Sequence, residues 1–264
     1  TNAFINDKYT ITYFLYLFKN FSKKFILQNQ KMSLEIKNIS KKYNDQDALI
    51  NVSFSLKQGD IVGFLGPNGA GKTTLMKIIT STLKQDIGDV IVFGNNTITN
   101  DIITKNNIGY LAENNPLYKE MDVNEYLYFI AELYKVENKK EIINSLIKKT
   151  GLENERTKRI EQLSKGFKQR VGIAASLIND PKVLILDEPT TGLDPNQLIE
   201  IRNLIKEVGK EKIVLLSTHI LQEIPKICNR IIIINEGQIV ENIKMEELKN
   251  STINLEDHFH KLTA

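Results

Sequence analysis

The chain has 264 residues, of which 41% are hydrophobic and 25% charged, and its formal net charge is +3. This length and composition allow one sizeable α/β core, whereas a single cysteine, Cys228, excludes an internal disulfide and suits a reducing cytoplasm. Lysine outnumbers arginine 30 to 5, which argues against a phosphate-reading nucleic-acid surface, and no nucleic-acid motif is present.

Residues 1–31 differ from the rest of the chain. They carry five lysines against Asp7 and lack a clear apolar period. The apolar run 13–18 is shorter than the roughly 20 residues of a membrane span, and no small-residue cleavage site follows it. We expect non-native sequence upstream of a start at Met32; a disordered tail and a basic, aromatic membrane-surface anchor are the alternatives. Residues 1–31 are therefore left out of the fold prediction.

A phosphate-binding loop is the strongest motif in the chain. Residues 61–65 predict a buried strand, residues 74–79 have the apolar spacing of a helix, and the G-x-x-x-x-G-K-[ST] pattern lies between them. Backbone N–H groups of such a turn converge on a polyphosphate. We expect Lys72 to reach the β- and γ-phosphates and Thr73 to ligate Mg²⁺. The predicted nucleotide-binding residues here are Gly66, Pro67, Asn68, Gly69, Ala70, Gly71, Lys72, Thr73 and Thr74.

The stretch from about 115 to 162 predicts a helical insertion, because apolar residues recur at helical spacing and no strong strand intervenes. Two such series are Val123, Leu127, Ile130, Ala131 and Tyr134, and then Ile142, Ile143, Leu146 and Ile147. Most of these side chains are expected to pack between helices. Tyr118, Tyr126 and Tyr128 are candidates for exposed aromatic side chains.

Residues 163–170 read L-S-K-G-F-K-Q-R and precede an apolar helical series that comprises Val171, Ala174, Ala175 and Ile178. Ser164 is a good N-cap for this helix. Residues 182–189 then predict an apolar strand that ends in Asp187 and Glu188, at the strand end where α/β sheets place their chemistry. An N-cap or a solvated turn is the alternative for these two acids. Beside a phosphate loop, Asp187 suits Mg²⁺ binding and Glu188 suits activation of the attacking water.

Towards the end of the chain, the apolar strand 213–216 is followed by Ser217, Thr218 and His219. Residues 230–240 predict two strands that turn at Glu236 and Gly237. Residues 242–264 predict a short helical tail.

In the order and spacing of these motifs, residues 32 to 263 resemble the ABC ATPases. Residues 163–167 resemble the family signature L-S-G-G-Q, from which Lys165 and Phe167 depart, while Ser164 and Gly166 are kept. The resemblance implies a P-loop NTPase fold of class α/β, with a RecA-like parallel-sheet core, an antiparallel β subdomain and a helical subdomain. It also implies that Ser164 and Gly166 of one subunit close over the γ-phosphate held by a second subunit.

The resemblance assigns further roles. Tyr43 matches the aromatic residue that stacks on adenine, although a strand-end tyrosine is the alternative, Asp194 matches the D-loop, and His219 matches the H-switch at the γ-phosphate. Glu113 stands where the wider family has glutamine, so it keeps an oxygen for Mg²⁺ and loses the amide donors. Lys72, Glu188 and His219 are thus the expected catalytic residues, and Thr73, Glu113 and Asp187 the expected metal ligands.

One complete motif set implies one ATPase domain at 32–241 that pairs with a second copy, expected to form a homodimer. Residues 109–118, together with the phosphate loop and the ending 255–263, are most similar to ATPase subunits of ABC-2 exporters of the gliding-motility type. The expected function is to bind and hydrolyse ATP with Mg²⁺ and to drive a separate multi-span permease from the cytoplasmic side of the membrane. In that family, the helical subdomain and the loop that contains Glu113 form a groove that receives a coupling helix of the permease. Tyr118, Tyr126 and Tyr128 are the candidates for this groove. A non-transport ABC ATPase that regulates a cell-envelope assembly is the alternative.

Overall fold

The computed structural model describes residues 33–250 and 254–264 of the chain. The N-terminal segment 1–31, on which the three interpretations above bear, lies outside the described residues. Within the described residues, no helix is long and apolar enough to cross a membrane.

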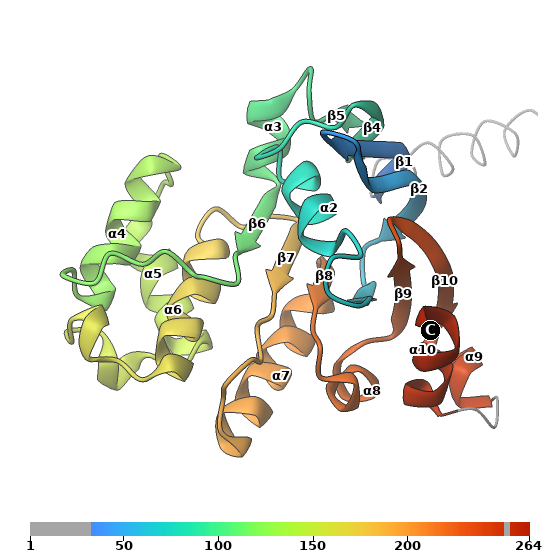
Figure 1. Ribbon diagram of the computed structural model, residues 1–264. Coiled ribbons are helices and arrows are strands. Elements are labelled where there is room, and N and C mark those ends of the chain that lie inside the picture. Colours follow the sequence, from blue (N-terminus) through green and yellow to red (C-terminus); the bar gives the residue numbers. More distant parts are fainter. Residues whose placement is uncertain (1–32, 251–253) are drawn as a thin grey trace, which may run out of the picture.

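The first described residues form an antiparallel sheet, in the strand order β2-β1-β4-β5. Its strands are β1 (Ser33–Tyr43), β2 (Gln46–Lys57), β4 (Ile87–Val92) and the short β5 (Asn95–Asn96). Alternate residues of β1 and β2, such as Leu34 and Leu56, are buried, as expected for a sheet with one face against a core. This sheet lies above the second one in Figure 1.

The second sheet is the centre of the molecule and has the strand order β10-β9-β3-β8-β7-β6. Five strands are parallel: β3 (Ile61–Leu65), β6 (Ile108–Leu111), β7 (Val183–Asp187), β8 (Ile213–Ser217) and β9 (Arg230–Asn235). β10 (Gln238–Lys244) pairs antiparallel with β9. All residues of β3, β7 and β8 are buried, because helices cover both faces of the sheet.

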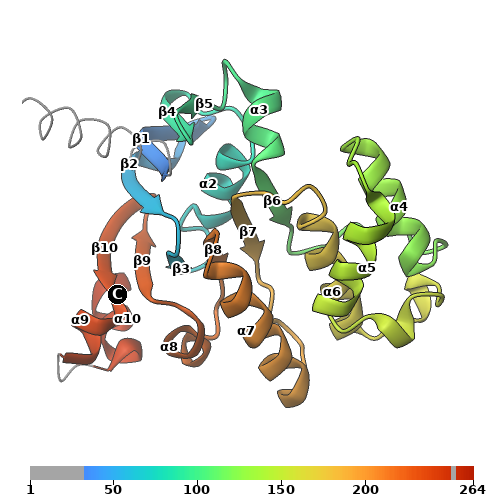
Figure 2. The same cartoon turned by 180° about the vertical axis from the view of Figure 1, so that it is seen from behind.

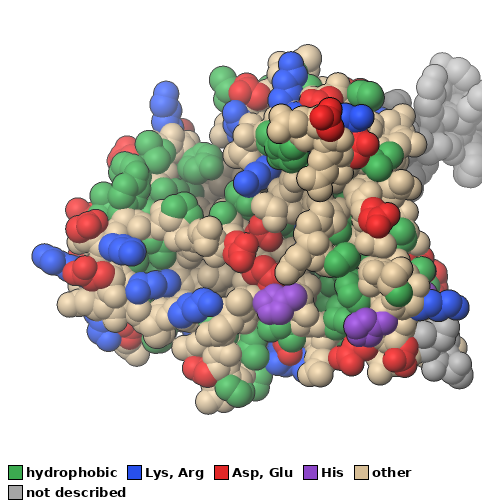
Figure 3. Space-filling view, in the orientation of Figure 1, with side chains coloured by type: hydrophobic (Ala, Val, Ile, Leu, Met, Phe, Trp, Pro, Cys, Tyr) green, Lys and Arg blue, Asp and Glu red, His purple; other side chains and the backbone are tan. Residues whose placement is uncertain are grey.

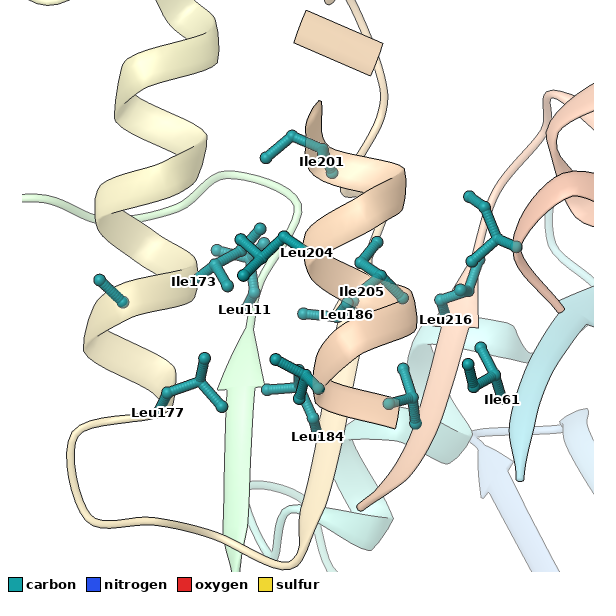
Figure 4. Close-up of a cluster of buried hydrophobic side chains, with 14 of the residues drawn as sticks. Ile61, Leu111, Ile173, Leu177, Leu184, Leu186, Ile201, Leu204, Ile205 and Leu216 are labelled. Carbon is teal, nitrogen blue, oxygen red and sulfur yellow. The ribbon is translucent and has the colours of Figure 1, made fainter. Parts of the chain in front are cut away.

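Helices cover the sheet on its two sides. α2 (Lys72–Ile79) packs in one core with the antiparallel sheet. α7 (Pro195–Gly209) and α6 (Lys165–Ser176) belong to the other core. Figure 4 shows Leu204 of α7 beside Ile173 of α6, above leucines of β6 and β7. Two shorter helices near the sheet are α3 (Asp101–Asn106) and α8 (Ile224–Ile227), with a 3-10 turn at Leu221–Glu223.

The insertion after β6 is helical, as predicted. It contains α4 (Val123–Leu133), α5 (Lys139–Lys149) and two 3-10 turns, Glu153–Glu155 and Ile160–Gln162. Together with α6 it projects to one side of the sheet in both views (Figures 1 and 2). The tail contains α9 (Met245–Asn250) and α10 (Leu255–Thr263), which lie near β9 and β10.

Residues 74–79 are helical, as predicted, within α2, which begins at Lys72. Two local predictions are corrected by the structure. Helix α6 ends at Ser176, so Ile178 lies in the following turn. Residues 242–244 of the predicted helical tail continue strand β10, since their backbone pairs with β9. The predicted boundaries 32–241 and 242–264 themselves stay a prediction.

The aromatic candidates of the insertion also separate. The prediction that Tyr126 is exposed is wrong, because its side chain faces the core of the insertion and only 7% of the residue is exposed. Tyr118 is 52% exposed and its ring meets Phe129 edge-on. Tyr128 is half-buried against the same core. Tyr134 was expected on the packed face of α4, but it follows the last residue of that helix and is exposed.

Candidate active site

The phosphate loop joins β3 to α2, as its motif predicts. Gly69 and Gly71 have φ values of +81° and +105°, a region that favours glycine. A Cβ at Gly66 would lie 2.3 Å from the carbonyl oxygen of Ile234 in β9, and a Cβ at Gly71 would lie 2.5 Å from that of Ala48 in β2. Two of the loop glycines are therefore required by close packing as well as by the ligand that such a loop cradles.

Lys72 begins α2, and its ammonium group donates hydrogen bonds to the carbonyl oxygens of Gly66 (2.6 Å) and Pro67 (2.9 Å). Desolvation lowers the pKa of Lys72, while the charges of Glu188 and Asp187 act in the opposite direction. The cation thus lies in the loop and in the electrostatic field of both acids. This arrangement suits a group that attracts the oxygens of a polyphosphate.

Asp187 and Glu188 lie at the carboxyl end of β7. Asp187 is 4% exposed, and burial raises its pKa, while a hydrogen bond from Ser217 opposes the shift. The Ser217 hydroxyl donates to Oδ1 of Asp187 over 2.5 Å. Asp187 also contributes to a raised pKa of about 12 at Tyr110, where burial is the first cause and Glu113 a smaller one.

The carboxylate of Glu188 is held on one oxygen by two partners. Thr191 donates a hydrogen bond to Oε2 over 2.7 Å, and Nδ1 of His219 lies 2.9 Å from the same atom. His219 follows β8, the neighbour of β7, so parallel pairing places both residues at one edge of the sheet. Figure 3 shows one face of the molecule, and acidic side chains lie beside a histidine near the middle of that face.

The predicted metal ligands share one donor chemistry. A hydroxyl from Thr73 and carboxylates from Asp187 and Glu113 are oxygen donors, which Mg²⁺ prefers. Within residues 33–250 and 254–264, no cluster of three or more His, Cys, Asp or Glu side chains could hold a metal ion by itself. As oxygen donors, these side chains fit Mg²⁺, which also commonly binds water and substrate phosphates.

Ser164 caps α6, and its Oγ accepts a hydrogen bond from the N–H of Phe167 over 3.4 Å. The residues around it contact the segment 192–197 of the same chain. A Cβ at Gly166 would lie 2.4 Å from the Gln197 side chain, and a Cβ at Gly192 would lie 2.4 Å from Nζ of Lys165. Lys165, one of the two departures from the signature, therefore lies over Gly192.

Asp194 caps α7 and accepts a hydrogen bond from the N–H of Gln197 over 2.9 Å. The Gln197 side chain accepts one from the N–H of Asp194 over 3.4 Å, and its amide lies 3.5 Å from Oγ of Ser164. Ser164, Gly166 and Asp194 thus form a second group of predicted residues. In the described part of the chain, no hydrogen bond or ion pair joins residues 163–170 to the phosphate loop.

Tyr43 ends β1 and is 47% exposed, with Nζ of Lys41 6.0 Å from its ring centroid. The hairpin that carries Tyr43 also supplies the Ala48 carbonyl that packs on Gly71. The aromatic ring therefore belongs to the segment that borders the phosphate loop, and its role toward a base stays a prediction.

Three residues without a predicted role form side-chain hydrogen bonds to side chains of predicted ones: Thr191, Gln197 and Ser217. The D-x-x-Q spacing of Asp194 and Gln197 is that of a capping box and could have indicated Gln197. No sequence signal indicates Ser217 as a partner of Asp187, because neither strand contains a pattern that predicts the pairing of β7 with β8.

The fold and the residues around the phosphate loop define a P-loop nucleotide-binding protein. Its second group of predicted residues, around Ser164, lies at the N-terminus of α6, and we call this group the signature edge. Residues 49–191 match the sequence profile of the family described as ABC transporter. Among curated relatives, the bacitracin transport ATP-binding protein BcrA of Bacillus licheniformis is 38% identical over 80% of this chain and 69% of its own length. The lantibiotic transport ATP-binding protein SrtF of Streptococcus pyogenes is 37% identical over 86% of this chain and 96% of its own.

Solved structures agree with these relatives. The ATP-binding subunit of an ABC transporter superimposes with a TM-score of 0.80 at 27% identity, covering 88% of this chain and 99% of that one. A bacterial ABC transporter cassette solved as a dimer has a TM-score of 0.72 at 27% identity, covering 80% and 98%. The chain belongs to the ABC transporter family and is its ATP-binding, ATP-hydrolysing component. The predicted fold class is confirmed.

Proposed function

We propose that this chain is the ATPase subunit of an ABC exporter and works as a dimer around two ATP molecules. Two observations support the proposal: relatives that serve bacitracin and lantibiotic transport, and the separation of the signature group from the phosphate loop within one chain. A multi-span permease of ABC-2 type is the proposed partner. The subunit then works on the cytoplasmic face of the membrane, attached through that permease.

At the proposed site, Tyr43 stacks on adenine and the loop 66–74 binds the phosphates, with Lys72 at the β- and γ-phosphates. Thr73, Asp187 and Glu113 hold Mg²⁺, which supplies charge neutralisation at the phosphate oxygens. Glu188 takes the proton of the attacking water, and His219 fixes the carboxylate through Oε2. Ser164 and Gly166 of the second subunit bind the γ-phosphate at the N-terminus of α6, beside Asp194.

The carboxylate of Glu188 carries the catalytic assignment, and Glu188→Gln tests it. The amide keeps the shape but cannot accept the proton, so we expect unchanged ATP affinity and a turnover lower by on the order of a hundredfold or more. Glu153→Gln, an exposed glutamate in a 3-10 turn, is the matched control. Normal turnover by Glu188→Gln would contradict the assignment.

The same variant tests the partner. Trapped with ATP in its native host and extracted gently from membranes, the Glu188→Gln protein is expected to bring a multi-span permease with it. Recovery of soluble or envelope-assembly proteins alone would favour the alternative, a non-transport ATPase that regulates a cell-envelope machine. Identification by mass spectrometry decides between the two.

A further inference from the structure

Ser217 lies where the two acids meet. It is the last residue of β8 and pairs in register with Asp187, the last residue of β7. Paired residues of neighbouring strands project from the same face of a sheet. Ser217 is 0% exposed, so its hydroxyl must find its partners inside the protein.

One hydroxyl serves both acids. Its proton goes to Oδ1 of Asp187 over 2.5 Å, and its oxygen accepts the N–H of Glu188 over 3.1 Å. The Ser217 carbonyl oxygen accepts the same N–H over 3.2 Å. The donor is therefore committed to one carboxylate oxygen, and the acceptor holds the backbone at Glu188.

Both effects bear on the reaction. A buried carboxylate that is free to rotate presents either oxygen, whereas a hydrogen bond to Oδ1 leaves Oδ2 for a ligand. Glu188 has a φ of +54°, which a non-glycine residue adopts only when neighbours enforce it. The Ser217 acceptor is one of those neighbours, because it binds the N–H at the start of the turn.

We propose that Ser217 is a positioning residue of the ATPase site, which orients Asp187 for Mg²⁺ and fixes the backbone from which Glu188 reaches the water. This inference rests on the roles proposed above for Asp187 and Glu188. Ser217 itself contacts neither nucleotide nor metal in the proposal.

Ser217→Ala removes both hydrogen bonds and keeps the strand. We expect the Mg²⁺ concentration that half-saturates tight mant-ATP binding to rise by about tenfold or more, as for other residues that orient metal ligands. Turnover falls with it, whereas mant-ATP binding in EDTA stays as in the wild type. Fluorescence titration at fixed nucleotide and varied Mg²⁺ gives the first result without any turnover.

Ser176→Ala is the matched control. Ser176 is also a buried serine, and its hydroxyl donates to the carbonyl oxygen of Ile173 in α6, away from both acids. It is expected to leave the Mg²⁺ requirement unchanged. Equal behaviour of Ser217→Ala and Ser176→Ala would overturn the proposal.

Ser217→Cys keeps the experiment decisive if the alanine variant does not fold. A thiol fills the site but is a weak donor, so its Mg²⁺ requirement should lie between those of serine and alanine; a wild-type value overturns the proposal. Glu188→Gln is measured in parallel. If it turns over ATP normally, the catalytic assignment itself fails; if it is inactive while both Ser217 variants behave as wild type, only this inference fails.

Discussion

Glu188 combines an unusual backbone conformation with a crowded carboxylate. Its φ of +54° lies where few non-glycine residues are found, and such strain persists when the surroundings enforce it. The N–H is bound by Ser217 and the carboxylate by Thr191 and His219. These contacts therefore hold the acid in one orientation in the turn after β7.

The buried thiol of Cys228 is predicted to make the stability of the fold depend on pH. Burial raises the pKa of its thiol, while an unfolded chain has a value of about 8.5. Because the folded value is the higher one, the contribution to stability is complete below about pH 8.5 and is lost as the pH rises beyond it. Between pH 7.5 and 9.5 this loss amounts to about 1.4 kcal/mol.

Urea unfolding of the wild type and Cys228→Ala at both pH values measures this term. The alanine variant leaves a small cavity and is expected to be less stable throughout, but its loss between the two pH values should be smaller by that amount. Other titrating groups are common to both proteins and cancel. An equal loss in the two proteins would show that the thiol does not carry the effect.

At the scale of elements, α6 links the two groups of predicted residues. Its N-terminus bears Ser164, and its middle contacts the segment after β6, where Nδ2 of Asn115 donates to the carbonyl oxygen of Lys168 over 2.9 Å. Arg170 donates to the carbonyl oxygen of Thr150 and forms an ion pair with Glu200 of α7. A shift of α6 would therefore disturb contacts with the helical insertion, with α7 and with Asn115, which follows Glu113 in the chain.

Gly172→Ala tests how closely α6 is fitted. In an exposed helix this change stabilises by about 1 kcal/mol. Here the added Cβ would lie 2.5 Å from Nδ2 of Asn115 and from Cδ1 of Leu111, so we expect a loss of about 1–3 kcal/mol in the free energy of unfolding. Denaturant unfolding measures it.

The sign of that change decides the prediction, since a gain in stability would mean that α6 has room to spare. The double variant Gly172→Ala with Asn115→Ala is the control for the contact. It is expected to recover part of the loss, because removing the amide gives the new methyl group space.

At the scale of the whole molecule, the signature edge and the phosphate loop occupy different places on the chain. Lys72 lies at the start of α2, whereas Ser164 lies at the start of α6, on the side of the helical insertion (Figures 1 and 2). In the dimer proposed above, a complete site takes its halves from two chains.

Mixing two inactive variants tests this composition. Lys72→Ala removes the phosphate-loop cation, and Ser164→Arg blocks the signature edge, so each is expected to be inactive alone. A mixed dimer keeps one complete site, with the loop of one chain and the signature of the other. Phosphate release should then reappear on mixing and be highest at equal amounts.

The appropriate control mixes each variant with a chain that carries both changes, which leaves no complete site. Absence of turnover in every mixture, together with normal wild-type turnover, would contradict the homodimer. That outcome would favour a heterodimer with a different ATPase subunit.

Local patterns predicted much of the architecture. Strand β3 has the predicted bounds 61–65, because an uninterrupted apolar run next to a glycine-rich turn has few other solutions. The helical insertion and the cap at Ser164 followed from apolar spacing and cap chemistry. The prediction that Tyr126 is exposed failed because tyrosine has both an apolar ring and a polar hydroxyl, so its presence does not indicate which side of a helix faces the core.

By itself, the sequence determined the parts that depend on neighbours along the chain: the loop around Lys72, the strand that ends in Asp187, and the order of motifs that marks the family. Tertiary structure alone decided which distant residues meet. The register of β7 with β8 brought Ser217 to Asp187, and the packing of α6 on α7 brought Gln197 to Ser164. Strand order and helix packing arise from burial summed over the whole core, so no local window of sequence contains them.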